Sequence, residues 1–166
     1  MNIPELEFKD FVIKRAASTK EIGELVAAIQ KLGKKKGVIQ IFDSKRIASR
    51  VHLFGAYANA LIAFKNKTNR TKSMGMEMLL FAAMTDQIEE AIGIIGAKSS
   101  SDFVIFADRK AAFARLRPIL KVKSDFRDSA AHARSAATGF GIKGGQIDGI
   151  NARILQKMAL SRLNSG

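Results

Sequence analysis

Short apolar runs typical of β-strands alternate along the chain with longer stretches in which apolar residues recur every three or four positions. The strand-like runs cover residues 38–42, 76–83, 103–107 and 119–122. Helical spacing covers residues 18–32, 49–64, 85–95, 108–116, 124–137 and 149–163. Asp43 and Ser44 could in addition cap a short helix that ends at Ala48. Each element has to bury its apolar face against another, so this order predicts an α+β fold. We expect a small three- or four-stranded sheet, mostly antiparallel or mixed, wrapped by several helices.

The length and composition favour one domain with its own core. The chain has 166 residues, of which 47% are hydrophobic and none is cysteine. This length fits a single domain over residues 1–166, stabilised without disulfides or thiolate metal sites. The N-terminus carries early acids and no continuous apolar segment, and no apolar run approaches the ~20 residues of a spanning helix. We therefore expect a cytoplasmic protein without a signal peptide or a membrane partner.

The net charge of +13, from 28 basic and 15 acidic residues, favours a polyanionic partner such as nucleic acid. The segment 65–73 contains no acid, and its cations alternate with short polar residues that suit phosphate and sugar contacts. Its candidate RNA-binding residues are Lys65, Lys67, Arg70, Lys72 and Ser73. A second band contains Arg109, Lys110, Arg115, Arg117, Lys121, Lys123 and Arg127, whereas Lys34, Lys35 and Lys36 are interpreted as a solvated turn.

The aromatic content limits the kind of nucleic-acid recognition. The chain has no tryptophan and one tyrosine, and most of its 11 phenylalanines occupy core-phase positions. Stacking readers of single strands need exposed aromatic side chains on a sheet face. The sequence therefore favours recognition of the backbone and shape of a structured or terminal RNA element.

Residue patterns for catalysis are weak. His52 and His132 are isolated from each other and from any metal-ligand motif, so we expect no catalytic residue, metal or cofactor and no small-molecule substrate. Gly139, Gly141 and Gly144 match a dinucleotide-binding pattern, but a helix-like stretch precedes them and no acid follows Asp148. We interpret these glycines as a turn.

The last helical stretch is apolar on more than one side. Ile150, Ile154 and Met158 form one arc, and Leu155, Ala159 and Leu163 form another. A helix of this kind is either central to its own core or shared with a partner protein. The sequence leaves both interpretations open.

Four short segments carry a resemblance to a known family. They are His52-Leu53 with Ala56 and Ala60; Lys72-Ser73 with Glu77 and residues 79–82; Gln87-Ile88 with Ala91-Ile92 and Gly96; and Lys157, Met158, Ala159 and Leu160. In this order they resemble motifs of the kinase-binding, CGI-type subunit of KEOPS, with Phe81 where tyrosine is common. KEOPS is the archaeal and eukaryotic complex that makes threonylcarbamoyl-adenosine in tRNA.

The resemblance implies a non-enzymatic adaptor that binds the small atypical kinase/ATPase subunit of KEOPS and, in archaeal members, the 3′ CCA end of tRNA. By position, it adds Gln87 and Lys98 to the RNA site. It also implies a kinase-facing surface formed by Ile150, Ile154, Met158 and Leu163. Two alternatives remain, which are a small enzyme that uses His52 on a phosphorylated or nucleotide substrate and a homo-oligomeric structural protein that associates through its last helix.

Overall fold

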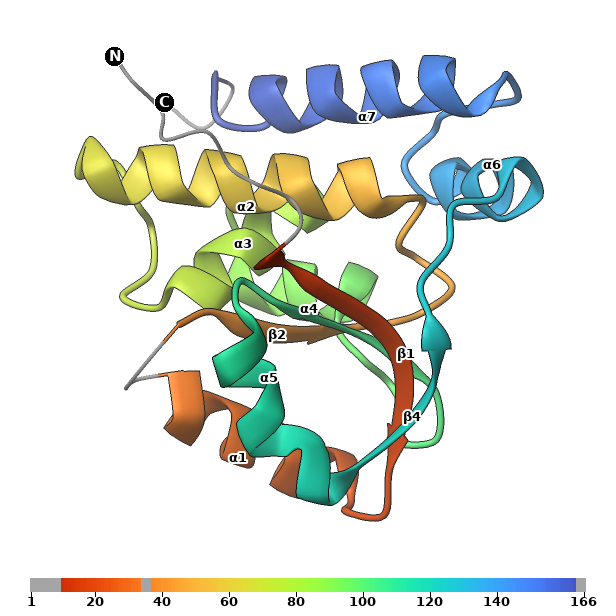
Figure 1. Cartoon of the computed structure of the whole chain (residues 1–166). Coiled ribbons are helices and arrows are strands. Elements are labelled where there is room, and N and C mark those ends of the chain that lie inside the picture. Colours follow the sequence, from red (N-terminus) through yellow and green to blue (C-terminus); the bar gives the residue numbers. More distant parts are fainter. Residues whose placement is uncertain (1–9, 34–36, 164–166) are drawn as a thin grey trace.

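An open antiparallel sheet of four strands lies at the centre of the computed structural model, which describes residues 10–33 and 37–163 (Figure 1). The strand order is β2-β3-β1-β4, with β1 at Val12–Ser18, β2 at Ile39–Phe42, β3 at Phe103–Ala107 and β4 at Leu120–Asp125. The expected α+β class is therefore confirmed. The runs 38–42, 103–107 and 119–122 are confirmed as strands, with shifts at their ends.

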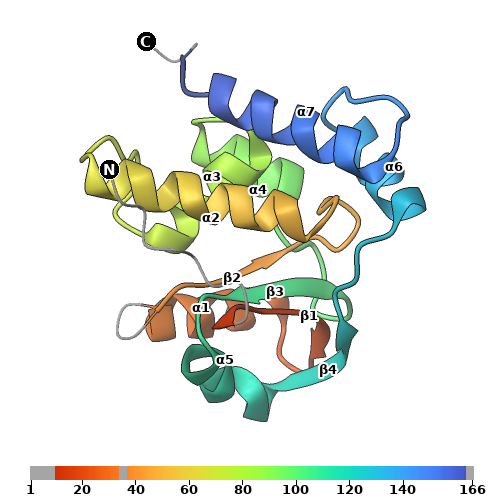
Figure 2. The same ribbon diagram turned by 45° about the horizontal axis from the view of Figure 1, so that its top comes forward.

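Helices cover both faces of the sheet (Figure 2). One face carries α1 (Ile22–Gly33) and α5 (Lys110–Leu116), the latter followed by a 3-10 turn, η2 (Arg117–Ile119). The other face is covered by α2 (Arg50–Lys65), α3 (Met74–Ala83), α4 (Ile88–Ile95), α6 (Ala130–Thr138) and α7 (Ile147–Leu160). Strand β3 contributes to both apolar clusters, because Ile105 faces α1 and α5 whereas Val104 and Phe106 face the larger helical layer.

Strand β1 has no counterpart among the sequence-predicted elements. Its sequence is interrupted by Lys14 and Arg15, which hide the apolar alternation. Both charges are compensated in the fold, since Lys14 pairs with Asp125 and Arg15 pairs with Asp102 at 2.9 Å. The strand lies between β3 and β4, so a stretch with two cations is nevertheless an interior strand of the sheet.

The prediction of a strand at 76–83 is wrong, because this run belongs to helix α3. Ser73 caps the helix by accepting a hydrogen bond from the Met76 backbone at 3.4 Å, and Met84 ends it in the left-handed conformation with φ 59°. Residues 77–83 are all buried, since α2, α4 and β2 surround the helix. A helix buried on every side loses its amphipathic period, so its sequence is indistinguishable from a buried strand.

Three further expectations about helices are corrected. The first helix begins at Ile22 instead of residue 18, because Ser18 ends β1 and donates to the Ile119 carbonyl at 2.7 Å. Helix α6 begins at Ala130, after the Ser129 cap, because residues 120–125 form β4. Residues 44–46 form a turn in place of a short helix.

Helix α2 lies between the sheet and α7 (Figure 2). Its close contact with α7 depends on Gly55, where an added Cβ atom would lie 2.3 Å from Cδ2 of Leu155 and 3.5 Å from Sδ of Met158. The N-cap residue of α2, Ser49, also donates a 2.6 Å hydrogen bond to Asn151 of α7. These contacts fix the position of α7 over the rest of the fold.

Candidate RNA-binding and partner-binding site

The connection between α2 and α3, residues 66–73, places the first basic cluster on a short, exposed loop. Lys65 ends α2, and Lys67 adopts the left-handed conformation with φ 57°. The side chains of Lys65, Lys67, Lys72 and Ser73 are exposed. Within the described residues, no carboxylate lies within ion-pair distance of these three lysines. The loop therefore presents cations that are available for an anion.

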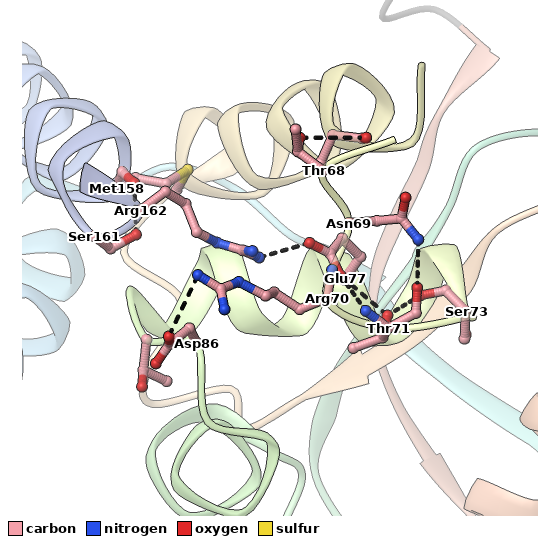
Figure 3. Close-up of polar contacts among 12 residues, drawn as sticks. Thr68, Asn69, Arg70, Thr71, Ser73, Glu77, Asp86, Met158, Ser161 and Arg162 are labelled. Carbon is pink, nitrogen blue, oxygen red and sulfur yellow. Dashed lines mark hydrogen bonds and ion pairs between the residues drawn. The ribbon is translucent and has the colours of Figure 1, made fainter. Parts of the chain in front are cut away.

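Glu77, on α3, holds this loop in place (Figure 3). Its buried Oε2 accepts hydrogen bonds from the backbone nitrogens of Arg70 at 3.0 Å and Thr71 at 2.9 Å, and from the Thr71 hydroxyl at 3.1 Å. Asn69 adds a hydrogen bond to the Thr71 carbonyl at 2.8 Å. Backbone donors ordered in this way give the loop one shape before any ligand binds.

The second oxygen of Glu77 is bound from the other end of the chain. Its Oε1 accepts a 2.6 Å hydrogen bond from Nη2 of Arg162, just beyond α7. The Arg162 guanidinium also stacks on the Phe81 ring, at 4.2 Å from the ring centroid. Glu77 and Arg162 form a largely buried ion pair, which is costly to break because one charge would remain uncompensated.

Neither member of this pair was predicted as a site residue, although Glu77 lies in one of the segments that carry the family resemblance. A usable signal for Glu77 existed, since it is the single acid in the apolar run 76–84 and a buried carboxylate needs donors. No comparable signal marked Arg162.

The structure brings Arg70 and Gln87 together at Asp86. The Arg70 guanidinium lies 3.7 Å from an Asp86 oxygen, and the Gln87 amide donates to the other oxygen at 3.2 Å. Lys98 lies elsewhere, beyond the C-terminal end of α4, where its ammonium donates to the Ile92 carbonyl at 2.7 Å. Helix α4 separates it from Gln87 by about 12 Å of helix. Of the two residues added by the resemblance, Gln87 alone adjoins the loop.

Helix α7 turns one of its two apolar arcs inward. Ile150, Ile154 and Met158 are fully buried in the main core, so their assignment to a partner-facing surface is wrong in this structure. The opposite side exposes Leu155, Leu160 and Leu163, with 37%, 45% and 74% of their surface accessible. Leu163 therefore lies where a partner could reach it. The two arcs are equally apolar, so the sequence could not decide which one α2 covers.

Residues 13–144 match a family model described as kinase binding protein CGI-121, which covers well over half of the chain. The chain belongs to the CGI-121 family of kinase-binding proteins. No curated protein matches it. The CGI-121 match includes the loop 66–73 and Glu77 and ends before α7 begins.

His52 of this CGI-121 chain is unsuited to the enzyme alternative. The imidazole is fully buried, its Nδ1 accepts from the Ala48 backbone at 3.3 Å, and its Nε2 donates to the Ala82 carbonyl at 2.8 Å. Burial lowers the pKa of His52 to about 4, so the ring is neutral at physiological pH. A substrate has no access to this ring in the described structure.

The second basic band of this CGI-121 chain lies away from the loop. It runs along α5, η2 and β4 and includes exposed Lys110, Arg115, Arg117 and Lys121. Helix α5 covers the sheet face opposite α2 and α3. Lys123 is engaged with the Ser101 carbonyl at 2.6 Å. The triplet 34–36 lies outside the described residues. Neither a metal-binding group of three or more acids and histidines nor a helix able to cross a membrane occurs in the described parts of the chain.

Proposed function

We propose that this CGI-121 chain is a non-catalytic, cytoplasmic adaptor of the KEOPS complex. In this proposal it docks on the kinase/ATPase subunit and anchors the 3′ CCA end of tRNA while threonylcarbamoyl-adenosine is made elsewhere on the RNA. Tethering of this kind raises the effective concentration of the tRNA without chemistry at the tether.

The observation that carries the RNA-binding part is the loop 66–73 held by Glu77. The loop exposes Lys67, Lys72 and Ser73, and Lys65 is exposed at the end of α2 that leads into it. Its backbone is fixed by the hydrogen bonds of Arg70 and Thr71 to Glu77, so little ordering entropy is lost when phosphates bind. A short, rigid cationic loop suits a few phosphates of an RNA end.

The kinase-binding part is supported by the family and by the exposed side of α7. Leu155, Leu160 and Leu163 offer apolar surface on a helix that covers α2 from outside. A partner helix or groove could bury the surface of these leucines that is still exposed, which would stabilise the complex.

The direct test of the RNA site compares intact tRNA with tRNA lacking its CCA end, for the wild type and for the Lys67→Glu/Lys72→Glu double variant. We expect wild-type affinity to fall sharply when CCA is removed. The double variant should bind intact tRNA no better than the wild type binds the trimmed RNA. Affinities are measured by fluorescence anisotropy at one fixed salt concentration.

A matched control reverses the same number of charges on the opposite face of the sheet. The control variant Lys110→Glu/Arg115→Glu lowers the net charge by the same amount as the loop variant but leaves the loop intact. If this control loses as much affinity as the loop variant, binding follows the overall charge and the loop assignment is wrong.

In the homo-oligomer alternative, copies of the chain associate through the same exposed leucines. Light scattering of the pure chain distinguishes this alternative from the adaptor. An oligomer that dissociates on Leu160→Asp substitution would favour self-association over an adaptor. Met158→Asp is unsuitable for this test, because Met158 is buried and the change would perturb the core.

A further inference from the structure

The carboxylate of Glu77 joins two surfaces that are far apart in the sequence. One oxygen accepts hydrogen bonds from the backbone of the loop 66–73, and the other accepts from Arg162 beyond α7 (Figure 3). The proposed RNA-binding loop and the end of the proposed kinase-binding helix therefore depend on a single side chain.

We propose that the Glu77–Arg162 ion pair couples these two surfaces, so that kinase docking on α7 and RNA binding on the loop strengthen each other. This inference rests on the proposed function and adds a regulatory role to residues that contact neither partner directly. Arg162 and Glu77 would be positioning residues.

Arg162 lies between residues that a partner would cover. It follows the end of α7, and its neighbours Leu160 and Leu163 are exposed, with 45% and 74% of their surface accessible. Within the described structure, its buried Nε has no hydrogen-bond partner. The guanidinium is thus held by Glu77 on one side and by the Phe81 ring beneath it. A protein that covers both leucines would restrict the backbone on each side of Arg162 and keep its guanidinium in place.

The shape of the loop depends in turn on Glu77. If the Arg162 guanidinium moves away, the buried Glu77 carboxylate loses the cation that compensates its charge. The carboxylate must then move toward water or toward another donor. The same carboxylate orients the backbone nitrogens of Arg70 and Thr71, which directly precede Lys72. A shift of Glu77 therefore disorders the segment from which the cations project.

Coupling through one shared element is reciprocal. A kinase that stabilises the attached position of Arg162 raises the population of the ordered loop, and RNA that binds the ordered loop favours the attached position of Arg162. The two ligands then increase each other's affinity by the same factor.

The test measures tRNA affinity with and without saturating KEOPS kinase/ATPase subunit. The proteins are the wild type, Arg162→Gln and the control Arg153→Gln. Arg153 lies on α7 and carries the same charge as Arg162, but it donates to the carbonyls of Lys143 at 3.1 Å and Gly144 at 2.8 Å, away from Glu77. We expect the kinase to raise wild-type and Arg153→Gln affinity by roughly fivefold or more. Arg162→Gln should bind tRNA more weakly and show no gain, although it still binds the kinase.

A second measurement follows the loop itself by amide hydrogen exchange. Exchange at Arg70 and Thr71 should slow when the kinase binds the wild type and should be faster in Arg162→Gln, with circular dichroism confirming that the variant is folded. If the wild type does not bind tRNA, the proposed function fails at its first step and the coupling fails with it. If the wild type binds tRNA but the kinase changes neither affinity nor exchange, or if Arg162→Gln behaves like Arg153→Gln, the coupling alone is overturned.

Discussion

At the residue scale, the charge of Glu77 is compensated by groups from the loop and from the chain beyond α7. Its removal would strand Arg162, whose side chain is only 17% exposed, without an anion. We expect Glu77→Leu to lower the free energy of unfolding by roughly 3–5 kcal/mol.

The double variant Glu77→Leu/Arg162→Met removes both charges together. It should recover part of this loss, because no buried charge remains unpaired. Urea denaturation of the single and double variants measures both values. A double variant that is no more stable than Glu77→Leu would show that the pair contributes little beyond the loop contacts.

His52 contributes to the free energy of unfolding in a way that depends on pH, and its burial determines the sign of that dependence. Burial lowers its pKa from 6.5 to about 4 in the folded chain, so the unfolded chain binds the proton more readily. The stabilisation by neutral His52 is therefore fully present above about pH 6.5. As the pH falls toward 4, the free energy of unfolding decreases by up to about 3 kcal/mol.

The measurement compares urea unfolding of the wild type with that of His52→Gln between pH 7 and pH 4. The wild type should lose more stability over this range than the variant. Equal slopes for the two proteins would mean that the imidazole does not titrate as its burial requires.

At the scale of the elements, Gly55 sets the distance between α2 and α7. A Cβ atom at this position would lie 2.3 Å from Cδ2 of Leu155, so Gly55→Val should push α7 outward and lower the melting temperature. Gly93 in α4 is the matched control, because a Cβ there meets no atom within 4 Å. Gly93→Ala should raise the free energy of unfolding by roughly 0.5–1 kcal/mol.

The sequence predicted the elements that are amphipathic, with one buried face, and those that form a short, continuously apolar strand. Strand β3 and the amphipathic helix α1 are confirmed, although α1 begins later than expected. Helix α3 was mistaken for a strand because it is enclosed on all sides, and β1 was missed because its charges find partners on distant segments. These features depend on tertiary contacts, which local periodicity does not encode.

The part of the candidate site that is contiguous in the sequence was predictable, whereas the contacts between distant segments were not. The basic residues at 65–73 could be found because they are contiguous in the sequence. Glu77, which holds that loop, is bound by Arg162, and these two residues are 85 positions apart in the sequence. The inward arc of α7 likewise depends on packing against α2, so its assignment required the structure.

At the scale of the whole molecule, cations lie on two separate faces, and they should differ in their effect on salt dependence. If the loop contacts phosphates of a single-stranded RNA end, Lys72→Gln should reduce the slope of log affinity against log salt by about 0.7. Lys110→Gln, on the other side of the sheet, should leave this slope unchanged. Titrations over several potassium chloride concentrations measure both slopes, and equal reductions would assign RNA contacts to both faces.

The sheet ends at β4, which has a neighbour on one side only, β1. Along this edge strand Lys121 precedes the exposed Val122, whereas the ammonium of Lys123 is held by Ser101 and Asp102. Two such edges would bring the Lys121 charges of both copies together if they met, so Lys121 discourages strand-to-strand aggregation. Acetylation of Lys121 should consequently favour precipitation of the concentrated protein.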